Sequence, residues 1–173
     1  MNRVENIFVI EWKGPYIDIE QIKDEDFENS FYLITGRKSL REELSIQYCG
    51  ISKSRSVFKR LMDRDHKHNI IKKDKQIWIG QFSNKKHNLY KWIELSESLI
   101  IYYWGPRLNY NKKKRPPKQP IGIINRWQKI NGDYRRNIAH SAQKLDDVII
   151  YDGEFFWATN KLIVQTMEDP NGI

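Results

Sequence analysis

The stretch of sequence that decides the fold is Glu97-Ser-Leu-Ile-Ile-Tyr-Tyr-Trp-Gly-Pro-Arg-Leu-Asn109. Apolar residues recur at helical spacing through its first half and before it, which predicts a helix over residues 88–104. Gly105-Pro106 ends this helix, because proline cannot continue it. The first predicted element is therefore a glutamate-bearing helix followed by a Pro-Arg-Leu-Asn segment.

The two glutamates of this helix differ in their expected surroundings. Glu97 falls at the edge of the apolar stripe, whereas Glu94 points well away from it. A half-buried carboxylate costs free energy unless a cation or a hydrogen-bond donor compensates. That cation is either a Lys or Arg side chain or a bound metal ion, and on this observation alone the ion pair is favoured.

Two β-prone runs, residues 31–35 and 46–50, precede the helix and predict an antiparallel pair of strands with a long connection. Side chains two apart on a strand share a face, so Tyr32 lies with Ile34, and Tyr48 lies with Ile46. Both tyrosines can therefore project from one face of a sheet. Ordinary strand packing would explain either of them alone.

A short helix with a basic surface is expected next. Ser52 or Ser54 can cap it, and apolar residues recur at helical spacing from Val57 to about residue 64. Arg60 lies on this helix. A third β-like run, residues 76–82, then leads to the glutamate helix.

The terminal segments add further expected elements. Residues 7–12 are β-prone and are followed by Gly14-Pro15, a turn pair that is expected to end the strand. Residues 135–145 predict a helix, and residues 148–157 predict a hairpin whose turn is Asp152-Gly153 and whose aromatic residues belong to the core. We therefore expect an N-terminal extension (1–29), a core (30–112) and a C-terminal extension (113–173) in one globular unit.

Composition favours an acidic partner and limits the chemistry. The 173 residues carry a formal net charge of +8, which suits a phosphate backbone but also an ordinary basic protein. The single cysteine, Cys49, cannot form an internal disulfide, and neither a secretory signal nor a membrane-spanning run is evident, so we expect a cytoplasmic protein without a membrane partner. The four histidines, His66, His68, His87 and His140, show no helical ligand pair with a carboxylate, so any metal is expected to be held by oxygen.

Basic side chains gather in three stretches, and each is either a phosphate-contacting surface or a solvated one. The first lies between the tyrosine strands, the second on the short helix, and the third in a proline-containing segment after residue 109. The candidate nucleic-acid-binding residues are Arg37, Arg41, Lys53, Arg55, Lys59, Lys112, Lys113, Lys114 and Arg115.

The order of these elements resembles the GIY-YIG nuclease superfamily. Its two name-giving motifs correspond to Ser30-Phe31-Tyr32 and Tyr48-Cys49-Gly50, its helix arginine to Arg60, and its glutamate helix to the segment from Glu97 to Asn109. Ser30 replaces the usual glycine, and Cys49 replaces a branched aliphatic residue. The resemblance covers about half of the chain. It implies an α+β fold in which helices flank a small, mainly antiparallel three-stranded sheet, with N- and C-terminal extensions.

The resemblance also implies roles for individual residues. Glu97 would hold a single Mg²⁺ or Mn²⁺ ion, and Arg60 would neutralise charge that develops on the phosphate. Tyr32 or Tyr48 would activate the attacking water, and either phenol would need a lowered pKa to do so. Asn109 would anchor the chain behind Glu97, and His66 is the nearest match to a family histidine.

The expected function is a metal-dependent endonuclease that hydrolyses phosphodiester bonds in double-stranded DNA, with restriction-like site specificity. One alternative is a non-catalytic nucleic-acid-binding module, although that reading is weakened by the presence of both Arg60 and Glu97. Another is a structure-specific repair nuclease or RNA nuclease with the same site. A palindromic target would imply a homodimer or sequential nicking by a monomer, and the sequence does not choose between them.

Overall fold

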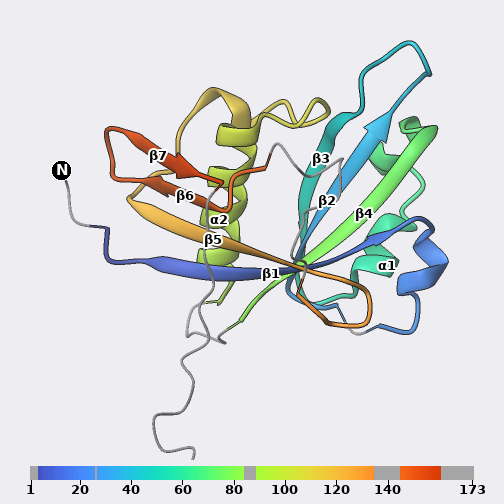
Figure 1. Cartoon of the computed structure of the whole chain (residues 1–173), viewed down its shortest axis with the longest axis horizontal. Coiled ribbons are helices and arrows are strands. Elements are labelled where there is room, and N and C mark those ends of the chain that lie inside the picture. Colours follow the sequence, from blue (N-terminus) through green and yellow to red (C-terminus); the bar gives the residue numbers. More distant parts are fainter. Residues whose placement is uncertain (1–3, 26, 84–88, 135–144, 161–173) are drawn as a thin grey trace, which may run out of the picture.

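Alternating buried residues along Ile7–Tyr16 build β1, the strand at the centre of the fold. In the computed structural model, which describes residues 4–25, 27–83, 89–134 and 145–160, β1 pairs antiparallel with β4 (Lys73–Phe82) and parallel with β5 (Ile121–Gln128). The strands form one seven-stranded mixed sheet in the order β3-β2-β4-β1-β5-β6-β7 (Figure 1). The other strands are β2 (Ser30–Arg37), β3 (Ser45–Ser52), β6 (Val148–Tyr151) and β7 (Phe156–Thr159).

The expected fold class, an α+β fold with a small three-stranded sheet flanked by helices, is wrong. The three expected strands are present as β2, β3 and β4, and β2 lies between the other two, antiparallel to both. The sheet does not stop there, because the second edge of β4 pairs with β1 and β1 pairs with β5. The described residues contain only two α-helices, α1 (Val57–Leu61) and α2 (Leu89–Trp104), so the fold is mostly β.

Gly14-Pro15, expected to end the first strand, lies inside β1 instead. The register between β1 and β4 shifts between Lys13 and Tyr16. Such an irregularity can accommodate proline, which has no N–H to donate to a regular ladder. Strands from the N-terminal segment, the expected core and the C-terminal segment therefore share one sheet.

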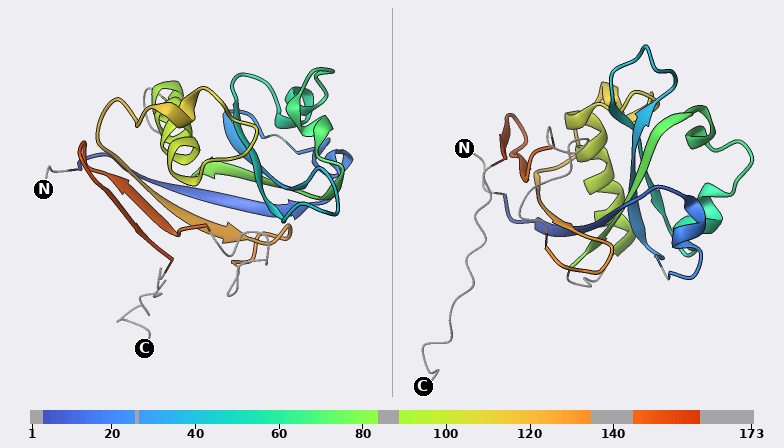
Figure 2. Two further views of the ribbon diagram at one scale, coloured as in Figure 1. Left: turned by 90° about the horizontal axis from the view of Figure 1, so that it is seen from above. Right: turned by 45° about the vertical axis from the view of Figure 1, so that its right-hand side comes forward.

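Different elements bury the two faces of the sheet. Helix α2 packs on the inner face against a cluster that includes Phe8, Trp12 and Trp78, and Figure 2 shows the sheet bending around this helix. A second cluster, on the other face of β2 and β4, includes Tyr32 and Ile34 and is covered by α1 and the 3₁₀ helix η1 (Ile19–Ile22). Tyr32 therefore lies inside a packed layer.

Some local predictions hold and others need correction. The C-terminal hairpin is confirmed, because β6 and β7 pair antiparallel. Helix α1 is shorter than expected, and Ser56 caps it rather than Ser52 or Ser54. Phe155 and Trp157, expected in the core, are 61% and 47% exposed.

The helix expected over residues 135–145 lies almost entirely outside the described residues. Among the helices that the structure does describe, none combines the length and apolar character needed to cross a membrane.

Candidate active site

The two tyrosines of the predicted site lie face to face on neighbouring strands. Tyr32 on β2 and Tyr48 on β3 stack with ring centroids 5.9 Å apart and an interplanar angle of 27°. Tyr32 is fully buried, whereas Tyr48 is only partly buried. Of the two phenols, Tyr48 is therefore the one with access to solvent.

Gly50 leaves the space that the Tyr32 ring occupies. In the β2–β3 ladder, Gly50 is the direct partner of Tyr32. A Cβ atom on Gly50 would lie 2.5 Å from the Cζ and Oη atoms of Tyr32. Only glycine allows this approach, which explains the third residue of the Tyr48-Cys49-Gly50 motif in physical terms.

His66 precedes the 3₁₀ helix η2 (Lys67–Ile70), and its ring contacts both tyrosines. Its Nε2 atom lies 2.9 Å from the Tyr32 hydroxyl, and its ring centroid lies 5.2 Å from that of Tyr48. The backbone N–H of His68 donates to Nδ1 of His66 over 3.1 Å. Because Nδ1 accepts this bond, a neutral His66 carries its proton on Nε2 and donates it to Tyr32.

Burial keeps both histidines neutral. It is the main cause that lowers the pKa of His66 from 6.5 to about 4, with His68 and Arg60 adding to the effect. Burial likewise lowers the pKa of His68 to about 4, together with Lys75 and Lys72. His66 is thus a hydrogen-bond donor to Tyr32 at neutral pH.

The two phenols have different electrostatic surroundings. Burial raises the pKa of Tyr32 well above its usual value, and the nearby Arg60 lowers it only in part. Burial also raises the pKa of Tyr48, but a hydrogen bond from Tyr32 and the charge of Arg60 act in the opposite direction. His66 thus donates to Tyr32, and Tyr32 in turn acts to lower the pKa of Tyr48, so of the two phenols Tyr48 accommodates negative charge better.

Arg60 is held beside these residues by an acidic neighbour. Its Nη1 atom lies 2.7 Å from Asp63, which also binds Arg55 at 2.6 Å. The guanidinium is near enough to influence the pKa values of both tyrosines and His66. Asp63 therefore positions Arg60 and also offsets part of its charge.

Glu97 lies on α2, near enough to Tyr48 to influence its pKa. Its exposure is only 7%, and its carboxylate forms an ion pair with Lys112 of the 3₁₀ helix η3 (Lys112–Lys114). Burial raises the pKa of Glu97 and Lys112 opposes that rise. Glu97 in turn raises the pKa of Tyr48, which places the carboxylate in the same cluster as the tyrosines.

Asn109 fastens the segment behind α2 to the edge of the sheet. Its side chain accepts a hydrogen bond from the Cys49 backbone N–H at 2.9 Å and donates one to the Cys49 carbonyl oxygen at 2.8 Å. The N–H of Leu108 also donates to the carbonyl oxygen of Gln47 on the same strand. These bonds match the anchoring role expected for Asn109, and they cover the outer edge of β3.

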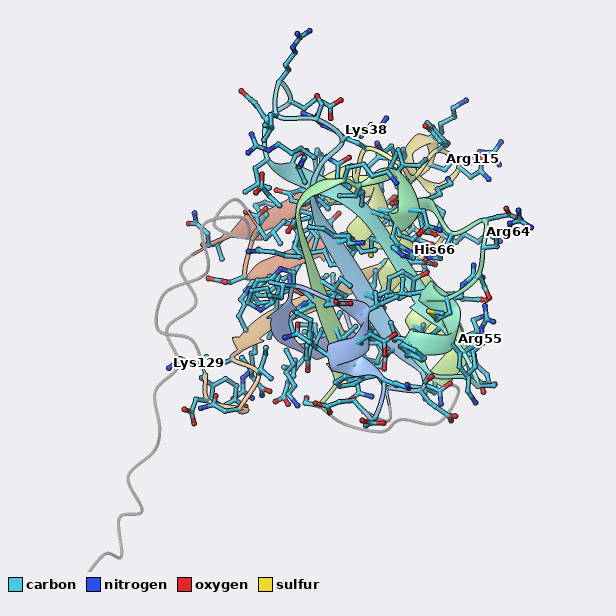
Figure 3. All side chains as sticks on the ribbon, turned by 90° about the vertical axis from the view of Figure 1, so that its right-hand side faces the viewer. Lys38, Arg55, Arg64, His66, Arg115 and Lys129 are labelled. Atoms are coloured by element: carbon cyan, nitrogen blue, oxygen red, sulfur yellow. The ribbon has the colours of Figure 1, made fainter. Side chains whose placement is uncertain are left out.

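The candidate nucleic-acid-binding residues divide into two groups. Four of them form ion pairs within the protein: Arg37 with Asp74, Lys53 with Glu94, Arg55 with Asp63 and Lys112 with Glu97. The others have no ion pair with any described residue, and they are Arg41, Lys59, Lys113, Lys114 and Arg115. Figure 3 shows Arg55, Arg64 and Arg115 on the same side of the molecule as His66.

Glu97 could supply one carboxylate ligand to a magnesium ion whose other ligands are solvent and phosphate oxygens. Across the described parts of the chain, no three His, Cys, Asp or Glu side chains are grouped to hold a metal ion. Mg²⁺ does not need such a group, since it often binds one or two carboxylates and keeps several waters. The buried Glu97 carboxylate fits this pattern once Lys112 moves aside.

Sequence reasoning missed two residues of this cluster. His68 fixes the tautomer of His66, and the His66-x-His68 spacing is the only signal that could have suggested it. Lys67 donates to the carbonyl oxygen of Leu108 at 2.7 Å and lies 5.9 Å from the centre of the Tyr48 ring. It thereby links η2 to the segment that Asn109 anchors.

Comparisons with protein-family models, with curated proteins and with solved structures find no significant match for this chain. The resemblance to GIY-YIG nucleases therefore depends on the residues and their arrangement alone.

Proposed function

We propose that this chain is a divalent-metal-dependent endonuclease that hydrolyses phosphodiester bonds in double-stranded DNA. The observation that carries the proposal is the cluster around β3, in which Tyr32, Tyr48, His66, Arg60 and Glu97 come from five separate segments. Packing alone does not explain why a buried carboxylate, an arginine and a hydrogen-bonded His66–Tyr32 pair converge on one partly exposed phenol, that of Tyr48.

In this proposal Tyr48 is the group that accepts a proton from the attacking water. The donors His66 and Tyr32 stabilise the ionised form of Tyr48, and Arg60 adds a positive charge. The Glu97 carboxylate opposes that ionisation, so a cation on Glu97 favours it. Tyr32 is then a positioning residue, because its ring stacks on that of Tyr48 and is closed off from solvent.

Glu97 would hold a Mg²⁺ or Mn²⁺ ion, which when bound polarises the phosphate and stabilises the leaving oxygen. Arg60 would face the same phosphate and neutralise the charge that develops on its oxygens. The unpaired cations Arg41, Lys113 and Lys114 would hold the flanking backbone. Restriction-like site specificity and a cytoplasmic location are part of the same proposal.

One observation favours a second candidate, a non-catalytic nucleic-acid-binding module. Lys112 already neutralises Glu97, so the place of the metal ion is taken by a side chain of the protein. In that case the protein binds nucleic acid without cutting it, and the carboxylate has a structural role.

A cleavage assay distinguishes these candidates. Purified protein is incubated with plasmid DNA, single-stranded DNA, branched DNA and RNA, with Mg²⁺ or with a chelator, alongside Glu97→Gln and Arg60→Ala. If the protein is an endonuclease, the wild-type protein is expected to cleave plasmid DNA in the presence of Mg²⁺, and both variants are expected to lose this activity. Binding without cleavage by the wild-type protein identifies the module instead, and preferential cleavage of RNA or of branched DNA identifies the repair or RNA nuclease.

A further inference from the structure

A pocket of about 680 Å³ opens between helix α2 and the segment that follows η3. Lys91 and Leu95 of the helix form one wall, and Arg115, Pro116 and Lys118 form the other. Lys112 also lines the pocket, and this is the lysine that pairs with Glu97. The pocket therefore adjoins the proposed active site through one shared side chain.

The charges of the pocket suit an anion. Four cations line it, namely Lys91, Lys112, Arg115 and Lys118, against the single carboxylate of Glu94. Glu94 is itself paired with Lys53, outside the pocket lining. The surplus of positive charge in a concave site concentrates anions there.

The apolar part of the lining suits the rest of a nucleotide. Leu95, Pro116 and Pro117 lie among the cations. A free phosphate would not contact such a surface, whereas a sugar and a base would. A phosphate joined to an apolar body, which is the chemistry of a nucleotide, matches both parts of the pocket.

We propose that this pocket holds a nucleotide of the substrate DNA strand next to the cleaved bond, with its phosphate bound by Lys91, Arg115 and Lys118. The inference rests on the proposed function, because it takes Glu97 to be part of the cleavage site. It adds to the binding residues Lys91, which the charge pattern along the sequence does not single out, and Lys118, the last residue of the basic segment after residue 109.

Lys112 couples binding in the pocket to the availability of the Glu97 carboxylate. A phosphate in the pocket competes with the carboxylate for the Lys112 ammonium group. When Lys112 turns toward the phosphate, Glu97 becomes free to take a divalent cation. The bound strand and the cation therefore increase each other's affinity by the same factor.

The pocket is tested by binding in the absence of metal. Fluorescence anisotropy with a short labelled double-stranded DNA oligonucleotide, in chelator, is measured for the wild-type protein, Lys91→Ala and Lys118→Ala. Each variant is expected to bind several-fold more weakly, and the magnitude of the slope of log affinity against log salt is expected to fall by about 0.9 for each lost phosphate contact. Lys129→Ala is the control, since Lys129 lies on the opposite side of the molecule from Arg115 (Figure 3).

Two results would overturn the inference: unchanged affinity in both pocket variants, or an equal loss in the Lys129→Ala control. Circular dichroism checks that each variant is folded. The same proteins are then assayed for plasmid cleavage. Pocket-dependent binding without cleavage by the wild-type protein leaves the pocket in place and refutes the nuclease, whereas wild-type cleavage with unaffected pocket variants refutes the pocket alone.

Discussion

The backbone N–H of His68 donates to Nδ1 of His66, and this bond sets the direction of the hydrogen bond between His66 and Tyr32. If Nδ1 carried the proton, Nε2 would accept from Tyr32 and that bond would be reversed. Because Nδ1 accepts, His66 donates to Tyr32, which agrees with the proposal that Tyr48 rather than His66 is the base.

The first prediction concerns the protonation state of His66. Long-range ¹H–¹⁵N spectra at neutral pH are expected to show a neutral ring with its proton on Nε2. Its titration is expected near pH 4 rather than at the usual 6.5. A ring with its proton on Nδ1, or a charged ring at pH 7, would contradict the direction assigned to the hydrogen bond between His66 and Tyr32.

The lowered pKa values of His66 and His68 also predict a pH dependence of stability. The unfolded chain binds protons at these side chains below pH 6.5, whereas the folded protein does so only near pH 4. The free energy of unfolding should therefore rise as the pH increases from about 4 to 6.5, and this contribution should reach its full size above pH 6.5. Urea unfolding measures this, and the variant with both histidines replaced by glutamine should show a smaller slope over the same range.

Substitution of the two tyrosines separates the proton acceptor from the positioning residue. Tyr48→Phe should lower kcat by about 100-fold while leaving KM nearly unchanged, because the group that activates water is lost. Tyr32→Phe should cause a smaller loss and shift the pKa of the ascending limb of the pH–rate profile upward, since Tyr48 loses an interaction that lowers its pKa. The opposite order of effects would assign the base to Tyr32.

Gly50→Ala tests whether the close approach of Tyr32 is required. The added Cβ would meet the Tyr32 ring at 2.5 Å, and the ring is fully buried, so the variant should lose about 2 kcal/mol of unfolding free energy. Gly122→Ala is the matched control on β5, where the nearest atoms are the Cγ1 atoms of Ile7 and Ile150, at 3.2 and 3.3 Å. Equal losses in both variants would show that the Tyr32 contact is not special.

The residues of the site could be predicted from the sequence more fully than the fold. Strand and helix periodicity locates Tyr32, Tyr48, Arg60 and Glu97 on their elements, because such periodicity is local. The position of β1 in the sheet cannot be predicted in this way, because it depends on long-range pairing. β1 pairs with β4 and also with β5, and β5 lies more than a hundred residues further along the chain. Gly14-Pro15 even pointed to an early end of that strand.

Contacts between side chains on separate elements could not be predicted from the sequence either. The position of Glu97 at the edge of the apolar stripe predicts a compensating cation, and it favours an ion pair with Lys or Arg over a bound metal ion. The identity of that cation, Lys112, depends on how the chain turns after Pro106 and is held by Asn109. The role of His68 is not predictable from its residue type, because its contribution comes from its backbone N–H, which every residue except proline possesses.

Asn109→Ala should detach this turn from β3. It would leave the N–H and carbonyl groups of Cys49 without their side-chain partners in a buried place, at a cost of about 2 kcal/mol or more. Asn69→Ala is a suitable control, because the exposed Asn69 amide makes only one hydrogen bond, to the carbonyl oxygen of Arg64. Urea unfolding should show a large loss for the first variant and little for the second, and similar losses would remove the anchoring role.

The pairing of Lys112 with Glu97 leads to the last prediction, which links stability to metal binding. In Lys112→Met the buried carboxylate loses its cation, so the free energy of unfolding at neutral pH should fall. Added Mg²⁺ or Mn²⁺ should then raise the melting temperature of this variant more than that of the wild-type protein, because the ion no longer competes with Lys112. The double variant Lys112→Met, Glu97→Gln should lose this metal-dependent shift, since its neutral amide binds the ion weakly. A shift of equal size in the double variant would mean that the ion binds elsewhere, and Glu97 would then be a structural partner of Lys112 rather than a metal ligand.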